Sequence, residues 1–337
     1  MTMARNYRLK YWNYKGRGIY MITINVEGRV PLLGMLQGGI DGAWVEYSAF
    51  GKMVSEQIEQ AFELYEQIQI CAKQLMPDHL HFVVWVKEDI PIPLGQIIRK
   101  MKIGCTHAWW EMSGRINTTC IDAIKSKNGI DATSLFEAGF HDRVLLHAGQ
   151  LKSLINYVHD NPRRAAIKRA NPELFRLRQK VLVAGFECTT LGNQFLKDDP
   201  MREMLQCSRT LTQAEIDLKK AECLRLAERG VVWVSAGISE GEKQICRAIR
   251  EAGYPMVVLL NEGFPDADSP HAKYYKPQGV YFEACAAGQL LLIEPESGLF
   301  EDKEIAEDVY RKDPRCTPNS KRYRFLALNA MARRMCK

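Results

Sequence analysis

Three features that would assign a chain to a whole class of protein are missing from this sequence. Its longest apolar runs, such as residues 255–260, are far shorter than the roughly 20 residues needed to cross a bilayer. No basic segment followed by an apolar one opens the chain, as a secretory signal would. None of the ten cysteines forms a C-x-x-C pair, which disfavours a zinc ribbon or a disulfide framework. These absences predict a cytoplasmic protein with reduced thiols and no membrane partner.

Acidic residues are scarce in the first half of the chain. Residues 1–180 contain 24 Lys and Arg against 17 Asp and Glu, a net charge of +7, whereas residues 181–337 contain 22 against 23, a net charge of −1. At 337 residues, the chain is long enough for two domains that each bury a core. The uneven charge predicts that the first domain binds a polyanion such as a nucleic-acid backbone.

Basic residues gather in several segments of this first half. The first 18 residues contain no acid, and aromatic residues at positions 7, 11, 12 and 14 are interleaved with their cations. Cations beside aromatic faces suit single-stranded DNA, whose bases are free to stack, although an ordinary charged arm has the same composition. A helix predicted over residues 97–110 has a basic face that either contacts DNA or is merely solvated. The predicted DNA-binding residues are Arg5, Arg8, Lys10, Lys15, Arg17, Arg99, Lys100, Lys102, Arg163 and Arg164.

Two histidines stand two residues apart in a strand predicted over residues 79–87. Because side chains alternate along a strand, His79 and His81 share one face, and Leu80 and Phe82 share the other. Two neutral imidazoles on a rigid strand are good ligands for a divalent metal. A solvated edge strand that happens to carry two histidines is the alternative.

A helix predicted over residues 150–161 contains a second pair of candidates. Apolar residues at positions 151, 154, 155 and 158 recur at helical spacing, and Pro162 is predicted to end the helix. Tyr157 and Asn161 are four residues apart and are therefore neighbours at the edge of the apolar stripe. A tyrosine hydroxyl can attack phosphorus when a metal polarises the phosphate, and an amide oxygen can be a hard metal ligand. Alternatively, the tyrosine packs and the asparagine caps the helix.

Together, the histidine strand and the tyrosine helix resemble those of the single-tyrosine HUH transposases. The match is closer to the REP-associated tyrosine transposases, which are similar in MPDHLHFVVWV at residues 76–86, FHDRVLL at 140–146 and YVHDNPRRAAI at 157–167. The resemblance covers about residues 5–178. A Gly-rich stretch between Val26 and Ser55 departs from it and predicts a hairpin insertion or decoration.

The resemblance implies a fold and a reaction for residues 1–178. The fold would be α+β and ferredoxin-like, with an antiparallel sheet flanked by helices. His79, His81 and Asn161 would hold Mg²⁺ or Mn²⁺, and Tyr157 would cleave single-stranded DNA beside a hairpin through a 5′-phosphotyrosine. The chain would act as a monomer or a homodimer. A catalytically silent DNA-binding regulator with the same fold stays an alternative.

The second half of the chain has a different pattern. Near-continuous apolar runs such as residues 231–234 are typical of strands buried on both faces, and they alternate with helical segments. This order predicts a Rossmann-like α/β domain over residues 185–337. The sequence of residues 319–337 predicts a basic helix at the end of this domain, either solvated or in contact with DNA or a partner.

The second half also resembles, more weakly, the Smf/DprA-type DNA-processing domain. The likeness lies in VSAGISEG at residues 234–241, VVLLNEGF at 257–264 and LLLIEP at 290–295. It implies an anion pocket that would take a nucleotide, because small-residue turns before a helix present N–H groups to phosphate. The glycines could instead only make tight turns, and a protein governed by a ligand of this domain is the third functional alternative. The pocket would be lined by Ser235, Gly237, Ser239 and Glu240, with Glu262 and Gly263 facing it.

Overall fold

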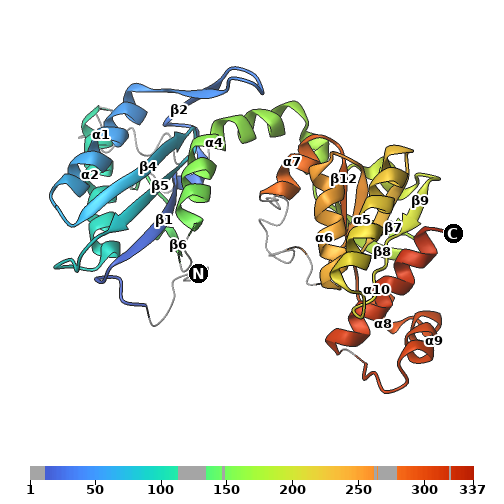
Figure 1. Ribbon diagram of the computed structural model, residues 1–337. Coiled ribbons are helices and arrows are strands. Elements are labelled where there is room, and N and C mark those ends of the chain that lie inside the picture. The colour runs from blue at the N-terminus through green and yellow to red at the C-terminus, as the bar shows by residue number, and fades with distance from the viewer. Residues whose placement is uncertain (1–11, 113–133, 146–148, 262–263, 265–278, 319) are drawn as a thin grey trace. The chain divides into compact units, whose positions relative to one another are not determined.

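The chain forms two compact units in the computed structural model, which describes residues 12–112, 134–145, 149–261, 264, 279–318 and 320–337 (Figure 1). The units are Met1–Ile167 and Lys168–Lys337. The sequence placed the division later, between residues 178 and 185. The division by contacts falls earlier because Phe175 already stacks on Phe282 of the second unit, and strand β7, Arg178–Val183, pairs with strand β8, Phe186–Gly192, in its sheet.

The first unit is built on a four-stranded antiparallel sheet. Its order is β4-β5-β1-β6, so the histidine strand β5 lies in the interior beside β1. This sheet confirms the predicted antiparallel α+β arrangement. The strands are β1 Gly18–Asn25, β4 Ile68–Met76, β5 His79–Val86 and β6 His141–Val144.

Helices cover both faces of this sheet (Figure 1). On one face, helices α1, Ala49–Glu63, and α2, Leu94–Met112, pack against the even-numbered residues of β5 in a large apolar core. On the other face, helix α4, Gln150–Ala170, packs through Leu154 and Val158 on Val83. Because His79 and His81 alternate with the core residues, they lie on the face covered by α4.

Helix α4 continues past Pro162, so the prediction that this proline ends it is wrong. Proline has no N–H to donate to the carbonyl four residues earlier, which is that of Val158. The side-chain amide of Asn161 donates to that carbonyl at 3.3 Å and to the carbonyl of Tyr157 at 2.8 Å. The neighbouring asparagine therefore satisfies the acceptor that the proline leaves, and the helix runs on.

The Gly-rich stretch after β1 forms the predicted hairpin. A short 3₁₀ turn at Glu27–Arg29 leads into strands β2, Gly34–Gln37, and β3, Trp44–Tyr47, which pair with each other as a separate two-stranded sheet. Ser48 then caps α1 by accepting a hydrogen bond from the Gly51 N–H.

The second unit has a six-stranded sheet of order β7-β8-β12-β11-β10-β9. Its four parallel strands alternate with helices, as the apolar runs predicted, and the β7–β8 hairpin is antiparallel at one edge. The parallel strands are β9 Arg202–Met204, β10 Val232–Ser235, β11 Met256–Leu259 and β12 Leu290–Pro295. The helices are α5 Gln213–Glu228, α6 Glu240–Glu251, α7 Val280–Ala286, α8 Gly298–Glu301, α9 Lys303–Lys312 and α10 Lys321–Met335, with 3₁₀ turns at Pro172–Phe175 and Gln194–Lys197.

The parallel strands follow one another in chain order across the sheet. Doubly wound sheets instead reverse direction, and ligands bind where the order reverses. Within the strands that the structure describes, β9 to β12 contain no such reversal. The domain is therefore α/β with a parallel sheet, without the doubly wound order that a Rossmann fold has.

The last helix differs from the solvated basic helix that its sequence predicts. Ala327, Leu328 and Met331 of α10 are fully buried in the core that also contains the parallel strands. Its cations lie on the remaining sides, where Arg333 pairs with Asp308. Although α10 is basic in composition, an apolar stripe along it packs against the sheet. None of the helices that the structure describes is long and apolar enough to cross a bilayer.

Candidate active site

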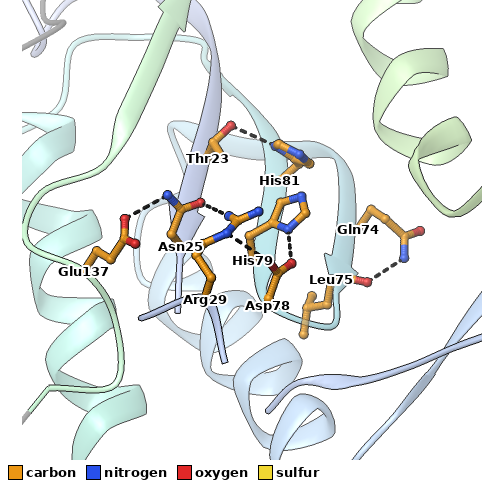
Figure 2. Close-up of polar contacts among 9 residues, drawn as sticks. All are labelled: Thr23, Asn25, Arg29, Gln74, Leu75, Asp78, His79, His81 and Glu137. Atoms are coloured by element: carbon orange, nitrogen blue, oxygen red, sulfur yellow. Dashed lines mark hydrogen bonds and ion pairs between the residues drawn. The ribbon is translucent and has the colours of Figure 1, made fainter. Parts of the chain in front are cut away.

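The two histidines of β5 lie side by side beneath α4. Their ring centroids are 4.8 Å apart and their planes are nearly perpendicular. His81 is 6% exposed, whereas the side chain of His79, the first residue of the strand, is 14% exposed. Figure 2 shows both rings on one side of the sheet. The shared face predicted from the i, i+2 spacing is thus present in the strand.

Each imidazole has a hydrogen-bond partner at Nδ1. The hydroxyl of Thr23, on the neighbouring strand β1, lies 2.8 Å from Nδ1 of His81, and a carboxylate oxygen of Asp78 lies 2.6 Å from Nδ1 of His79 (Figure 2). Such partners orient a histidine ring and select its tautomer. A metal would then be bound through Nε2 of each ring.

The carboxylate of Asp78 joins a longer chain of polar contacts. Arg29 pairs with Asp78 at 2.9 Å and also donates to the side chain of Asn25, which donates to Glu137 at 2.9 Å (Figure 2). Burial opposes ionisation of Asp78, but its hydrogen bond to His79 and the positive charge of Arg29 hold its pKa below the usual value. Asp78 is therefore an anion beside His79, as in the carboxylate–histidine pairs of metal sites.

Tyr157 of α4 lies directly over this face. Its ring centroid is 5.9 Å from that of His81, and the guanidinium of Arg164 lies 5.4 Å from the tyrosine ring. Burial raises the pKa of the Tyr157 phenol, while the charges of Arg164 and of Arg143 on β6 act in the opposite direction. The structure therefore brings Tyr157 together with His79 and His81, which lie more than seventy residues earlier in the chain.

Asn161 lies one turn after Tyr157 on the same helix. The residue is 9% exposed, and its side-chain amide donates to the two carbonyls of α4 described above. Among the contacts that the structure describes, none joins Asn161 to either histidine. Its role as a metal ligand stays a prediction, and its visible role is to sustain the helix around Pro162.

The predicted DNA-binding residues are not gathered at one place. Lys15 and Arg17 are exposed just before β1, at the end of the strand that pairs with Val86 rather than with His79. Arg163 forms a two-point ion pair with Asp160. Arg164 contacts Tyr157, whereas Arg99, Lys100 and Lys102 belong to α2 on the opposite face of the sheet. Arg5, Arg8 and Lys10 lie outside the described residues.

Several residues of the site had no role in the sequence prediction. Asp78 stands next to His79 in the sequence, so its adjacency was a usable signal. Thr23 had no such signal, because it reaches the site only through the pairing of β1 with β5, whereas Arg143 stands in the FHDRVLL segment that carries part of the resemblance. Gln74 of β4 also lies opposite His81 and shares its face (Figure 2). No group of three or more His, Cys, Asp or Glu side chains suited to a metal occurs among the described residues.

The predicted anion pocket of the second unit uses several of its own N–H groups internally. Gly237 donates to the hydroxyl of Ser235 at 3.0 Å, and Ile238 donates to the carboxylate of Glu242 at 2.7 Å. The N–H of Glu242 in turn donates to the hydroxyl of Ser239. These N–H groups stabilise the turn between β10 and α6 itself.

Acidic side chains also stand at this turn. Glu242 is 2% exposed and accepts a second hydrogen bond from the Cys207 N–H at 3.2 Å. Glu240 begins α6 and is exposed. Two carboxylates in the first turn of a helix occupy the positive end of its dipole, where a phosphate would otherwise bind. The nucleotide site stays a prediction, and Glu262 and Gly263 lie outside the described residues.

Comparisons with known proteins find similarity over about half of this chain. No family model matches it. An uncharacterised protein of Haemophilus influenzae is 22% identical over 178 residues, which cover 47% of this chain and 87% of that protein. A solved structure of a REP-associated tyrosine transposase bound to a REP hairpin is 18% identical, with a TM-score of 0.30 over 46% of this chain and 73% of that one. A candidate transposase from Deinococcus radiodurans is 11% identical, with a TM-score of 0.27 over 48% of this chain and 98% of that one.

Proposed function

We propose that the first unit cleaves and rejoins single-stranded DNA through a covalent bond to Tyr157. The observation that carries the proposal is the contact between Tyr157 of α4 and His81 of β5, beside the second histidine. A hydroxyl that can attack phosphorus thus lies beside two imidazoles that can bind a metal. Arg164 and Arg143, whose charges act on Tyr157, supply positive charge for a phosphate.

The donor set fits a divalent metal in part. His79 and His81 present two imidazoles whose orientation Asp78 and Thr23 hold, and these fit Mn²⁺ better than Mg²⁺, which prefers an all-oxygen shell. The amide oxygen of Asn161 is the proposed third ligand. A bound Mg²⁺ or Mn²⁺ would supply positive charge that polarises the scissile phosphate.

The side chains of the site would divide the work of the reaction. Arg164 and Arg143 bind the non-bridging oxygens and hold the phosphate in line with the tyrosine. The hydroxyl oxygen of Tyr157 forms a bond to phosphorus as it loses its proton, the bond to the 3′ oxygen breaks, and that oxygen takes up a proton. The products are a free 3′-hydroxyl and a 5′-phosphotyrosine. Attack by a 3′-hydroxyl on the phosphotyrosine reverses these steps and joins strands.

The proposed substrate is single-stranded DNA beside a hairpin. The resemblance of the histidine and tyrosine segments to the REP-associated transposases points to this substrate, and the net positive charge of residues 1–180 suits it. The reaction joins DNA ends without an external energy source because the covalent bond conserves the energy of the one that was cleaved.

The test is formation of a covalent adduct. A labelled library of single-stranded hairpins is incubated with the protein and Mn²⁺ and is then separated on a denaturing gel. We expect an adduct that Tyr157→Phe abolishes while hairpin binding on a native gel is retained. Tyr65→Phe is the matched control, because Tyr65 packs against the core on the opposite face of the sheet.

Two outcomes would contradict the proposal. An adduct that persists in Tyr157→Phe would exclude this tyrosine as the nucleophile. Tight hairpin binding without any adduct in the wild-type protein would instead favour a DNA-binding regulator that does not cleave.

A further inference from the structure

A cavity lies on the first unit, away from the tyrosine and the histidines. It has a volume of about 470 Å³, within the range of small-ligand pockets. One wall is the outer side of α2, and the other is the segment over residues 134–140 that leads into β6. Its lining includes Arg99, Lys102, His107, Trp110 and Phe140.

Lys102 holds the two walls of this cavity together. Its ammonium donates to the carbonyl of Glu137 at 2.7 Å and to that of Gly139 at 2.6 Å. Burial lowers the pKa of Lys102 to about 8, although the charges of Glu137 and Glu27 oppose this change. An anion in the cavity would stabilise the charge of this partly desolvated amine.

The far part of the cavity is aromatic. The rings of His107 and Trp110 are stacked, with centroids 5.3 Å apart and an angle of 27° between their planes. They stand one turn apart on α2, and Phe140 lies on the facing segment. Flat rings of this kind stack with a nucleobase of any sequence.

The charge of the cavity favours a phosphate. Arg99 lies one turn before Lys102 on α2 and is exposed. No Asp or Glu side chain lines the cavity among the described residues. Cations at one end of this helix face and stacked rings at the other match the phosphates and the bases of a single strand.

The cavity also lies within reach of the proposed active site. Phe140 packs on the core beneath α1 and α2, whereas His141 is opposite Thr23 and so faces the α4 side. Phe140 and His141 are consecutive residues at the edge strand of the sheet. A DNA strand that leaves the histidine strand β5 therefore passes β1 and the edge strand β6 before it reaches the cavity.

We propose that this cavity binds a short unpaired segment of the DNA strand that the tyrosine site cleaves, with one phosphate at Arg99 and a base against Trp110. This inference rests on the proposed function. Its role would be to hold the strand at a second point, so that the scissile phosphate stays in register with Tyr157.

The phosphate part is tested by two charge reversals on the same helix. Binding of a fluorescein-labelled oligothymidylate of about 12 nucleotides is measured by anisotropy in the Tyr157→Phe background without divalent metal. Arg99→Glu should lower the affinity about 10-fold or more, whereas Lys100→Glu, exposed next to it but outside the cavity lining, should lower it only about 2-fold. Equal losses in the two variants would overturn the assignment, because they would reflect general charge alone.

The base part is tested with an abasic oligomer of the same length. Stacking of a base is worth about 1–3 kcal/mol, so Trp110→Ala should reduce the preference for the oligothymidylate over the abasic oligomer at least about 5-fold. Trp44→Ala, which removes a 56% exposed tryptophan from the β2–β3 hairpin, should leave that preference unchanged. An unchanged preference in a Trp110→Ala protein that melts like the wild type would overturn the proposal.

These measurements are independent of the proposed chemistry. Anisotropy in the Tyr157→Phe background reports binding alone, and the denaturing gel reports the covalent step alone. Loss of the adduct with intact cavity binding would count against the reaction only. A normal adduct with no difference between Arg99→Glu and Lys100→Glu would count against the cavity only.

Discussion

The hydroxyl of Thr23 provides the sharpest test of how the fold prepares His81. Thr23→Val keeps the shape of the side chain but removes the oxygen that lies 2.8 Å from Nδ1 of His81. Because His81 is only 6% exposed, water has little access to replace the lost partner. A hydrogen bond of this kind contributes about 0.5–1.5 kcal/mol, and leaving a buried partner unsatisfied costs about 1–3 kcal/mol.

Two quantities should therefore change. The free energy of unfolding should fall by about 1–2 kcal/mol. The affinity for Mn²⁺ should fall about 10- to 100-fold, because the ring is no longer held in one orientation and tautomer. Titration calorimetry with Mn²⁺ measures the second effect, and thermal denaturation without metal measures the first.

Two controls separate orientation of the ring from general damage. Thr23→Ser keeps a hydroxyl at the same place and should retain most of the Mn²⁺ affinity. Thr106→Val removes a hydroxyl that donates to the Lys102 carbonyl on the opposite face of the sheet, and it should leave Mn²⁺ binding unchanged. Unchanged Mn²⁺ affinity in Thr23→Val, or an equal loss in Thr23→Ser, would refute the reasoning.

Two further predictions concern pH and stability. The charge of Arg164 lowers the pKa of Tyr157 against the effect of burial, so Arg164→Gln should raise that pKa further. Adduct formation should then rise with pH at a higher pH than in the wild type, and Arg164→Lys, which keeps the charge, should restore the wild-type profile. An unchanged midpoint in Arg164→Gln, or a shifted midpoint in Arg164→Lys, would contradict this role. Glu242→Gln should destabilise the second unit by about 1–3 kcal/mol, because one of the two oxygens that accept N–H groups becomes a donor. An unchanged midpoint in chemical denaturation, with Glu240→Gln as the exposed control, would show that these hydrogen bonds contribute nothing.

The sequence by itself determined the features that depend on local periodicity. The alternation of a strand placed His79 and His81 on one face, and the helical spacing of apolar residues placed the packed side of α4 next to Tyr157. The apolar runs likewise indicated the parallel strands of the second unit. Each of these conclusions needs only neighbours within a few residues along the chain.

Local rules were wrong where a neighbour supplied what a residue lacked. Pro162 was expected to end α4, but the side chain of Asn161 donates to the carbonyl that the proline leaves. The cations of α10 predicted a solvated helix, but a stripe of small and apolar residues packs on the sheet of the second unit. Composition counts residues of each kind, whereas packing depends on which of them share a side of the helix.

Only the tertiary structure decided which distant residues meet. Thr23 lies 58 residues before His81, and the pairing register of β1 with β5 places its hydroxyl at the imidazole. The choice of face for α4 sets Tyr157 over His81, and the approach of residues 134–140 to α2 forms the other wall of the cavity beside that helix. Periodicity determines which side of an element a residue occupies. What lies opposite that side depends on contacts between segments far apart in the chain, and no local pattern contains them.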